Sequence, residues 1–179
     1  MAPKATVYKV QLQIADMDRG YYQDHSLTLS QHPSETDARM MVRLLAFALN
    51  ASDTLVFSKG LCVEGEPELW QKSLSDEIEL WIEFGQSDEK WLRKASSRAD
   101  KVLLYTYGGR AVPIWWQQNE QALSRYQNLE VWNLAEESVK AMGEMVTRNM
   151  SLQVNISEGE VWLSNDSASF HICPECLKG

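Results

Sequence analysis

The chain has 179 residues, of which 44% are hydrophobic, and this is the size and composition of a globular protein that can bury one core. Its net charge of −8 excludes a protein that coats nucleic acid over its whole surface, because such binding requires many Lys and Arg side chains on the contact face. The sequence contains no apolar run of membrane-spanning length, and its start is polar. We therefore expect a soluble, cytoplasmic protein without membrane contact, folded as a single domain over residues 1–179.

Hydrophobic periodicity predicts strands and helices in alternation. A turn around Asp18, Arg19 and Gly20 should join the first two strands, and Ser34 with Asp37 has the spacing of a helix N-cap with an acidic capping box. In chain order we expect strands at 5–17 and 20–31, a helix at 35–51, strands at 54–58, 65–70 and 78–85, a helix at 87–99, a strand at 101–107, a helix at 117–126, a strand at 129–134, a helix at 135–150, and a hairpin of 151–157 and 160–164 turned at Gly159.

Charge is divided unevenly within residues 64–110. Nine acidic residues and one lysine occur up to Glu89, and six basic residues and one aspartate follow from Lys90. Within this segment the strand 78–85 alternates aliphatic and other side chains, which puts Glu83 on the face opposite the aliphatic one, together with Trp81. Carboxylates ahead of a basic helix can hold a divalent metal beside a surface that attracts phosphate.

The order helix, strand, strand, strand, helix, strand over residues 35–107 resembles the core of the PD-(D/E)XK nuclease-like superfamily. A narrower resemblance rests on four segments in the right order, HPSETDARMMVRLLAFAL, GLCVEGEPELW, IELWIEFGQSDEKWLRKA and KVLLYTYG. These are similar to the YaeQ family of small bacterial proteins, and the similarity covers nearly the whole chain. It implies an α/β fold with a mixed β-sheet of the PD-(D/E)XK (restriction endonuclease-like) type, flanking helices, and additional N- and C-terminal strands.

The same resemblance assigns site residues. It puts Glu68 where the superfamily has its PD aspartate, Glu83 at its second acidic position, and Glu35 at the carboxylate of the first helix. Glu68 and Glu83 are the implied ligands of Mg²⁺ or Mn²⁺, ions that bind oxygen atoms and complete their shells with water and phosphate.

The lysine position of the pattern is where this sequence departs from the superfamily. Two residues after Glu83 stands Gly85, which has no side chain to act. The nearest substitutes are Gln86, if the strand ends or bulges there, and Lys90 or Lys94 on the following helix, a variation that occurs within the superfamily. Lys94 is the preferred candidate, because glutamine can orient a water molecule but cannot supply positive charge.

These assignments predict a divalent-metal-dependent nuclease-like protein with a modified active site. The expected nucleic-acid contact is a local basic patch formed by Lys90, Arg93, Lys94, Arg98 and Arg110. The alternative is a non-catalytic module that binds nucleic acid or protein and has retained the fold.

Each candidate side chain also has a purely structural interpretation. Glu35 would be an acidic first-turn residue favoured by the helix dipole, Glu68 a loop carboxylate, and Glu83 a solvent-facing carboxylate at a sheet edge. The basic residues of the helix 87–99 would form an ordinary solvated face.

Three cysteines do not make a disulfide framework, which agrees with a reducing compartment. Cys62 is expected to be a small buried residue. Cys173 and Cys176 form a CxxC with His171 nearby, a spacing that can bind zinc or exchange a disulfide, but the sequence shows no second ligand pair. We therefore expect ordinary tail cysteines and no structural zinc.

Overall fold

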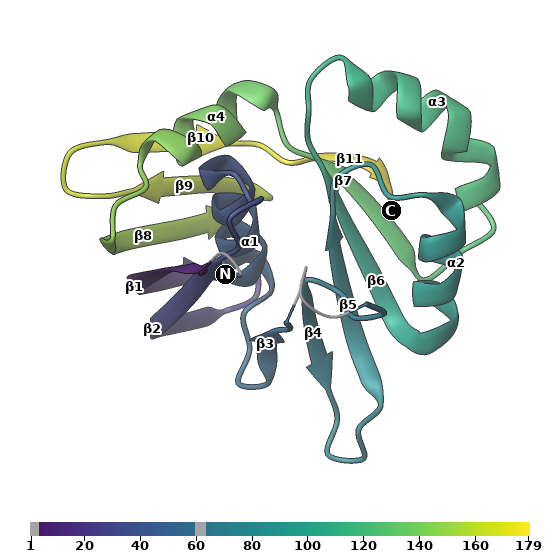
Figure 1. The fold of residues 1–179 in the computed structure, drawn as a ribbon, viewed down its shortest axis with the longest axis horizontal. Helices are drawn as coiled ribbons and strands as arrows, with labels where there is room; N and C mark the ends of the chain where they lie inside the picture. The colour runs from purple at the N-terminus through teal and green to yellow at the C-terminus, as the bar shows by residue number, and fades with distance from the viewer. Residues whose placement is uncertain (1–3, 60–63) are drawn as a thin grey trace. The chain divides into compact units, whose positions relative to one another are not determined.

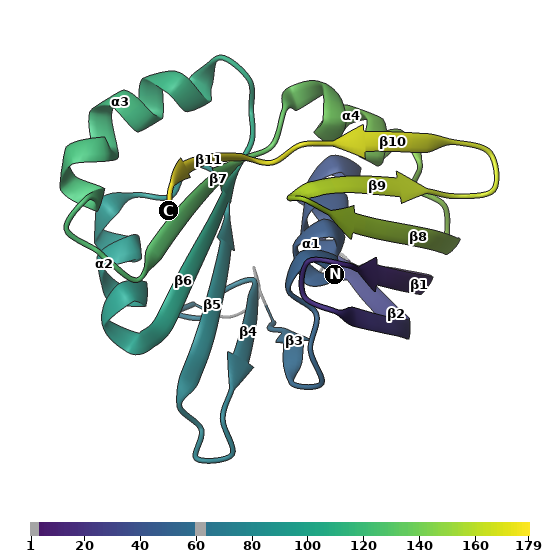
Figure 2. The same ribbon diagram turned by 180° about the vertical axis from the view of Figure 1, so that it is seen from behind.

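The computed structural model describes residues 4–59 and 64–179, which form two compact units, each built on its own β-sheet (Figures 1 and 2). Unit 1 comprises the chain up to Leu49 and Glu137–Pro174, and unit 2 comprises Asn50–Glu136 and Glu175–Gly179. Both sheets contain parallel and antiparallel pairs, so the expected mixed α/β class is confirmed. The single domain over residues 1–179 stays a prediction, and Cys62 lies outside the described residues.

The sheet of unit 1 has five strands in the order β10-β9-β8-β1-β2. The neighbours β1 and β8 run parallel, and the other pairs are antiparallel. The unit contains β1 (Thr6–Asp16), β2 (Tyr21–Gln31), α1 (Asp37–Asn50) except its last residue, α4 (Glu136–Glu144) except its first residue, β8 (Asn149–Ser157), β9 (Glu160–Ser164) and β10 (Ser169–Ile172).

Strand alternation builds the core of unit 1. In β1 the residues Val10, Leu12 and Ile14 are buried while their neighbours face solvent, as a period of two requires. Helix α1 lies against β2, where the ring of His25 meets Phe47 edge-on. The expected N-terminal hairpin and the turn at its end are both confirmed.

Helix α1 begins two residues later than predicted. The Oγ1 atom of Thr36 accepts a hydrogen bond of 3.1 Å from the N–H of Arg39, so Thr36 is the N-cap. The hydroxyl of Ser34 instead contacts Nδ1 of His32 at 2.6 Å. The predicted Ser34 cap is therefore wrong, because the capping residue is the one whose side chain reaches an N–H of the first helical turn. Glu35 consequently precedes the helix and is not a first-turn residue.

We expect Thr36→Ala to lower the free energy of unfolding by about 1 kcal/mol, because it removes the side chain that satisfies a free N–H of α1. Denaturant unfolding followed by circular dichroism measures this change. The matched control is Ser34→Ala, which should have a smaller effect, and equal effects of the two substitutions would contradict the assignment of the cap.

The sheet of unit 2 has six strands in the order β11-β7-β6-β5-β4-β3. The central strands β5, β6 and β7 are parallel, and β11, β4 and β3 are antiparallel to their neighbours. The unit contains β3 (Leu55–Phe57), β4 (Leu69–Lys72), β5 (Ile78–Phe84), α2 (Glu89–Arg98), β6 (Ala99–Thr106), α3 (Ala111–Leu123), β7 (Leu129–Asn133) and β11 (Glu175–Lys178).

Both faces of the central strands of unit 2 are covered by protein. Val102, Leu103 and Leu104 of β6 are all buried, which confirms the prediction of a strand buried on both sides. On one face, Trp81 of β5 belongs to an apolar cluster with residues of α2 and α3 such as Leu92. Figure 1 shows these two helices on the same side of the sheet.

Several element boundaries differ from the expectations. Helix α3 begins at Ala111 instead of 117, and α4 ends at Glu144 because Asn149 and Met150 pair with β1 as the start of β8. The strands β10 and β11 were not expected. Each is four residues long, too short to show a clear period; β10 pairs with the preceding strand β9 as a hairpin, and β11 pairs with β7, which is distant in sequence.

Candidate functional site

Glu83 lies inside the sheet of unit 2 rather than at its edge. Its strand β5 is flanked by β4 and β6, and the residue is 7% exposed. Its Oε1 accepts a hydrogen bond of 2.9 Å from Nε1 of Trp81 on the same face of the strand. The shared face of Glu83 and Trp81 is thus confirmed, and the alternative of a solvent-facing carboxylate at a sheet edge is wrong.

Glu68 stands directly before β4 and is 9% exposed. Its backbone N–H donates to the carbonyl of Ile82 at 3.1 Å, and its own carbonyl accepts from the N–H of Ser58. The ladder between β4 and β5 therefore extends to Glu68. Two nearly buried carboxylates thus come from adjacent segments of the sheet, with the backbone of Glu68 bonded to the residue before Glu83.

Helix α2 presents two cations beside the loop that leads to Glu68. Nη1 of Arg98 donates to the carbonyl of Gly65 at 3.1 Å, and the guanidinium lies 5.1 Å from the ring centroid of Trp81. A Cβ atom built on Gly65 would lie 4.0 Å from Nζ of Lys94. The same ammonium lies 5.5 Å from the ring of Trp91, a range in which a cation is attracted to an aromatic face.

The start of α2 explains how these cations are positioned. The carboxylate of Asp88 accepts a hydrogen bond of 2.8 Å from the N–H of Trp91, which makes Asp88 the N-cap. The buried residues Leu92 and Ala95 attach the helix to the apolar cluster. Lys94 is exposed, and the N-cap at Asp88 determines where it lies along the helix.

Gln86 follows the end of β5. A role for Gln86 in the site depended on the strand ending or bulging there, and this condition is met. Gly85 has a φ of 83°, a conformation that favours glycine, and the strand stops at Phe84. The side-chain amide of Gln86 donates to the carbonyl of Tyr107 at 2.6 Å. Gln86 therefore links the carboxyl ends of β5 and β6, an edge at which ligands gather in open α/β sheets.

Glu35 belongs to unit 1, whereas Glu68 and Glu83 belong to unit 2. One oxygen of Glu35 accepts from Nη1 of Arg39 at 2.6 Å and the other accepts from Nη2 of Arg43 at 2.8 Å. The carboxylate is therefore held by two arginines, and its interpretation as a first-turn residue favoured by the dipole is wrong because it precedes the N-cap.

The residues of the expected basic patch divide between different surroundings in unit 2. All of them are exposed, but Arg93 borders a depression of about 400 Å³ that Arg125 and Tyr126 also line. Lys94 and Arg98 instead adjoin the loop before Glu68. Arg110 stands at the start of α3.

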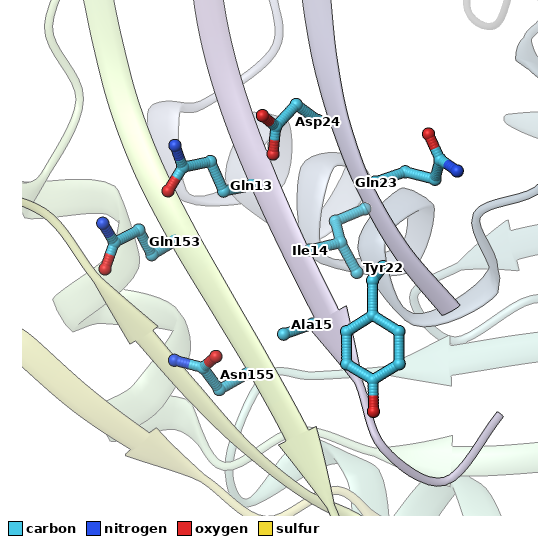
Figure 3. A pocket seen from close by; sticks show the side chains of 8 residues that line it. All are labelled: Gln13, Ile14, Ala15, Tyr22, Gln23, Asp24, Gln153 and Asn155. Carbon is cyan, nitrogen blue, oxygen red and sulfur yellow. The ribbon is translucent and has the colours of Figure 1, made fainter. Parts of the chain in front are cut away.

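A wider depression of about 610 Å³ lies on the sheet of unit 1 (Figure 3). Ala15 pairs with Tyr22 on one side and Asn155 on the other, and its small side chain leaves the hollow between them. Asp24 is the one acidic or basic residue among those that line it, so the depression offers little chemistry. The lining residues are Gln13, Ile14, Ala15, Tyr22, Gln23, Asp24, Gln153 and Asn155.

A further group was missed by sequence reasoning. Glu160, His171 and Cys173 offer ligand atoms that all lie within 4.8 Å of one another. The sequence analysis singled out His171 and Cys173, but Glu160 is brought beside them by the pairing of β9 with β10, and β10 was not expected.

No helix in the described part of the chain is long and apolar enough to cross a membrane.

Comparisons with known proteins identify relatives over nearly the full length. A family model described as YaeQ protein matches residues 1–174. The uncharacterized protein YaeQ of Escherichia coli K12 is 45% identical over 172 residues, which cover 96% of this chain and 95% of the relative. Its Salmonella typhi counterpart is 44% identical over 165 residues, covering 92% of this chain and 91% of the relative.

Two crystal structures share the fold. The YaeQ protein from Xanthomonas axonopodis pv. citri superposes with a TM-score of 0.95 at 46% identity, covering 98% of this chain and 99% of that one. The YaeQ protein from Pseudomonas syringae has a TM-score of 0.93 at 34% identity, covering 98% and 97% of the two chains. The arrangement of two mixed sheets with helices is thus shared with experimental structures.

Proposed function

Since the chain belongs to the YaeQ family and unit 2 holds two nearly buried carboxylates beside a basic helix, we propose that it is a divalent-metal-dependent phosphodiesterase acting on nucleic acid. The single observation that supports this most is the hydrogen bond from the backbone N–H of Glu68 to the carbonyl of Ile82, the residue before Glu83. Arg98 donates a hydrogen bond to the carbonyl of Gly65 in the loop that precedes Glu68. In this proposal unit 2 carries the strands and the second helix of a variant PD-(D/E)XK core.

The donor set fits a hard cation. Glu68 and Glu83 offer carboxylate oxygens from hydrogen-bonded neighbouring segments, and Mg²⁺ or Mn²⁺ is commonly held by one or two carboxylates with water and phosphate as the remaining ligands. When bound, such an ion polarises the phosphate and activates water. Glu35, whose oxygens accept from two arginines, is left out of the proposed ligand set.

The remaining residues supply charge and orientation. The Lys94 ammonium would stabilise the negative charge that develops on the phosphate, which is the task of the superfamily's missing lysine. The Gln86 amide nitrogen donates to Tyr107, which orients the side chain so that its oxygen can accept a hydrogen bond from an attacking water.

We expect Lys94→Ala to lower the rate of metal-dependent cleavage of labelled DNA or RNA by about 100-fold, which is the usual effect of removing one group that stabilises developing charge. The binding of Mn²⁺, measured by calorimetry, should stay unchanged, because Lys94 is not a ligand. The control is Lys90→Ala, an exposed lysine on the same helix, which should retain most of the activity.

A second candidate function is a non-catalytic module, and the presence of Gly85 in place of the lysine favours it. In that case Mn²⁺ or Mg²⁺ would bind at Glu68 and Glu83 without cleavage of DNA or RNA under any condition tested. A wild-type protein that neither binds these ions nor cleaves nucleic acid would overturn the proposed phosphodiesterase.

A further inference from the structure

The paired strands β9 and β10 place four side chains with metal-binding or aromatic chemistry on one face of the sheet of unit 1. His171 is paired with Trp162, and Ile172 with Val161, so Cys173 follows opposite Glu160. Val161 and Ile172 are buried on one face of the sheet, and alternation therefore directs the other side chains to the opposite, solvent-facing side.

The ligand atoms are spaced as a metal ion would hold them. Nε2 of His171 lies 3.3 Å from Oε2 of Glu160 and 3.4 Å from Sγ of Cys173, and Sγ lies 3.7 Å from Oε1 of Glu160. A tetrahedral zinc ion with bonds of about 2.0 Å to nitrogen and oxygen and about 2.3 Å to sulfur separates these ligands by about 3.3–3.6 Å. Rotation of the carboxylate, or its bidentate binding, brings an oxygen to a common ion.

We propose that Glu160, His171 and Cys173 form a site for a borderline divalent cation of the Zn²⁺ class. Imidazole and thiolate favour zinc over magnesium and calcium, which prefer oxygen ligands. In the part of the chain that the structure describes, these three residues are the one group of at least three His, Cys, Asp and Glu side chains with ligand atoms this close. The site is therefore chemically distinct from the pair Glu68 and Glu83.

Neighbouring side chains favour an ordered site. The ring of Trp162 stacks on His171 with centroids 4.8 Å apart and an interplanar angle of 23°. This contact restricts the rotation of the imidazole, and an oriented ligand loses less entropy when an ion binds. Three protein ligands leave a fourth position for water, as in open zinc sites rather than structural ones. The fold should therefore survive treatment with a chelator.

Binding should strengthen as pH rises, because a thiol must lose its proton before it can ligate a metal ion.

The test is calorimetric titration of the metal-free, full-length protein with Zn²⁺, together with absorption spectroscopy with Co²⁺. We expect one Zn²⁺ per chain, bound more tightly at higher pH, and a thiolate-to-cobalt charge-transfer band in the near ultraviolet. Glu160→Gln, His171→Ala and Cys173→Ser should each weaken binding by at least about 100-fold, and Cys173→Ser should abolish the band. These side chains are solvent-accessible, so the melting temperatures of the metal-free variants should match that of the wild type.

The matched control is Cys176→Ser, which changes the other exposed cysteine of the CxxC and should leave affinity and spectrum unchanged. If Cys176→Ser and Cys173→Ser both abolish binding while Glu160→Gln and His171→Ala bind normally, the CxxC pair is the ligand set and the proposed site is wrong. Absence of Zn²⁺ binding by the wild-type protein at neutral pH would also overturn it.

Discussion

Mn²⁺ is expected to raise the melting temperature of the wild-type protein, and Glu83→Gln is expected to abolish this response. An ion that binds only the folded state at one hundred times its Kd stabilises it by about 2.7 kcal/mol. For a chain of this length that corresponds to roughly 5–10 °C. The substitution removes the negative charge that attracts the ion but keeps an oxygen that can accept the hydrogen bond from Trp81, so the metal-free protein should be at least as stable as the wild type.

Differential scanning calorimetry with and without Mn²⁺ measures both effects, and Mg²⁺ should act in the same direction. The control is Glu64→Gln, an exposed glutamate of the loop before Glu68, which should alter neither stability nor the metal response. A Glu83→Gln protein that melts several degrees lower without metal, beside a wild type indifferent to millimolar Mn²⁺, would show that Glu83 serves only the hydrogen-bond network with Trp81.

The second large effect is expected from Glu35→Ala. The side chain of Arg43 is almost completely buried. Its Nη2 atom donates hydrogen bonds both to the Glu35 carboxylate and to the carbonyl of Ser30. Removing the carboxylate takes the Glu35 counter-charge away from this guanidinium, and breaking a buried ion pair in this way costs about 3–5 kcal/mol. The melting temperature should therefore fall by roughly 6–20 °C.

Thermal unfolding of Glu35→Ala should be compared with that of Glu130→Ala. Glu130 pairs with Lys101 at 2.7 Å, but the lysine side chain is half exposed, and such pairs contribute at most about 1 kcal/mol. The residual response of Glu35→Ala to Mn²⁺ is informative as well. A loss of that response with little change in stability would make Glu35 a ligand and contradict its description as a buried ion-pair residue.

Local chemistry was sufficient for most elements of the fold. Alternation in β1, the glycine turn at Gly20 and the apolar run of β6 follow from contacts within a few residues, and the structure confirms each of them. One error falls where pairing with a distant segment overrides local preference. Residues 149–150 continue a helical pattern but join β8 because β1 offers them a parallel partner.

The candidate site shows the same division. The sequence placed Glu83 and Trp81 on one face of a strand, because a pleated strand alternates its side chains. It did not reveal that α2 covers this face. The face that was expected to be polar is therefore buried, and Trp81 has no exposed surface. Burial of that kind depends on how the helix packs, which no local pattern contains.

The sequence by itself determined the family resemblance, the mixed α/β class, and the acidic and basic residues available for chemistry. Only the tertiary structure decided which of these residues meet. Arg98 reaches Gly65 across 33 positions, and Glu160 meets Cys173 through the pairing of β9 with β10. The physical reason is that periodicity and capping act over a few residues, whereas a site is assembled by strand pairing and helix packing between separate elements of the chain.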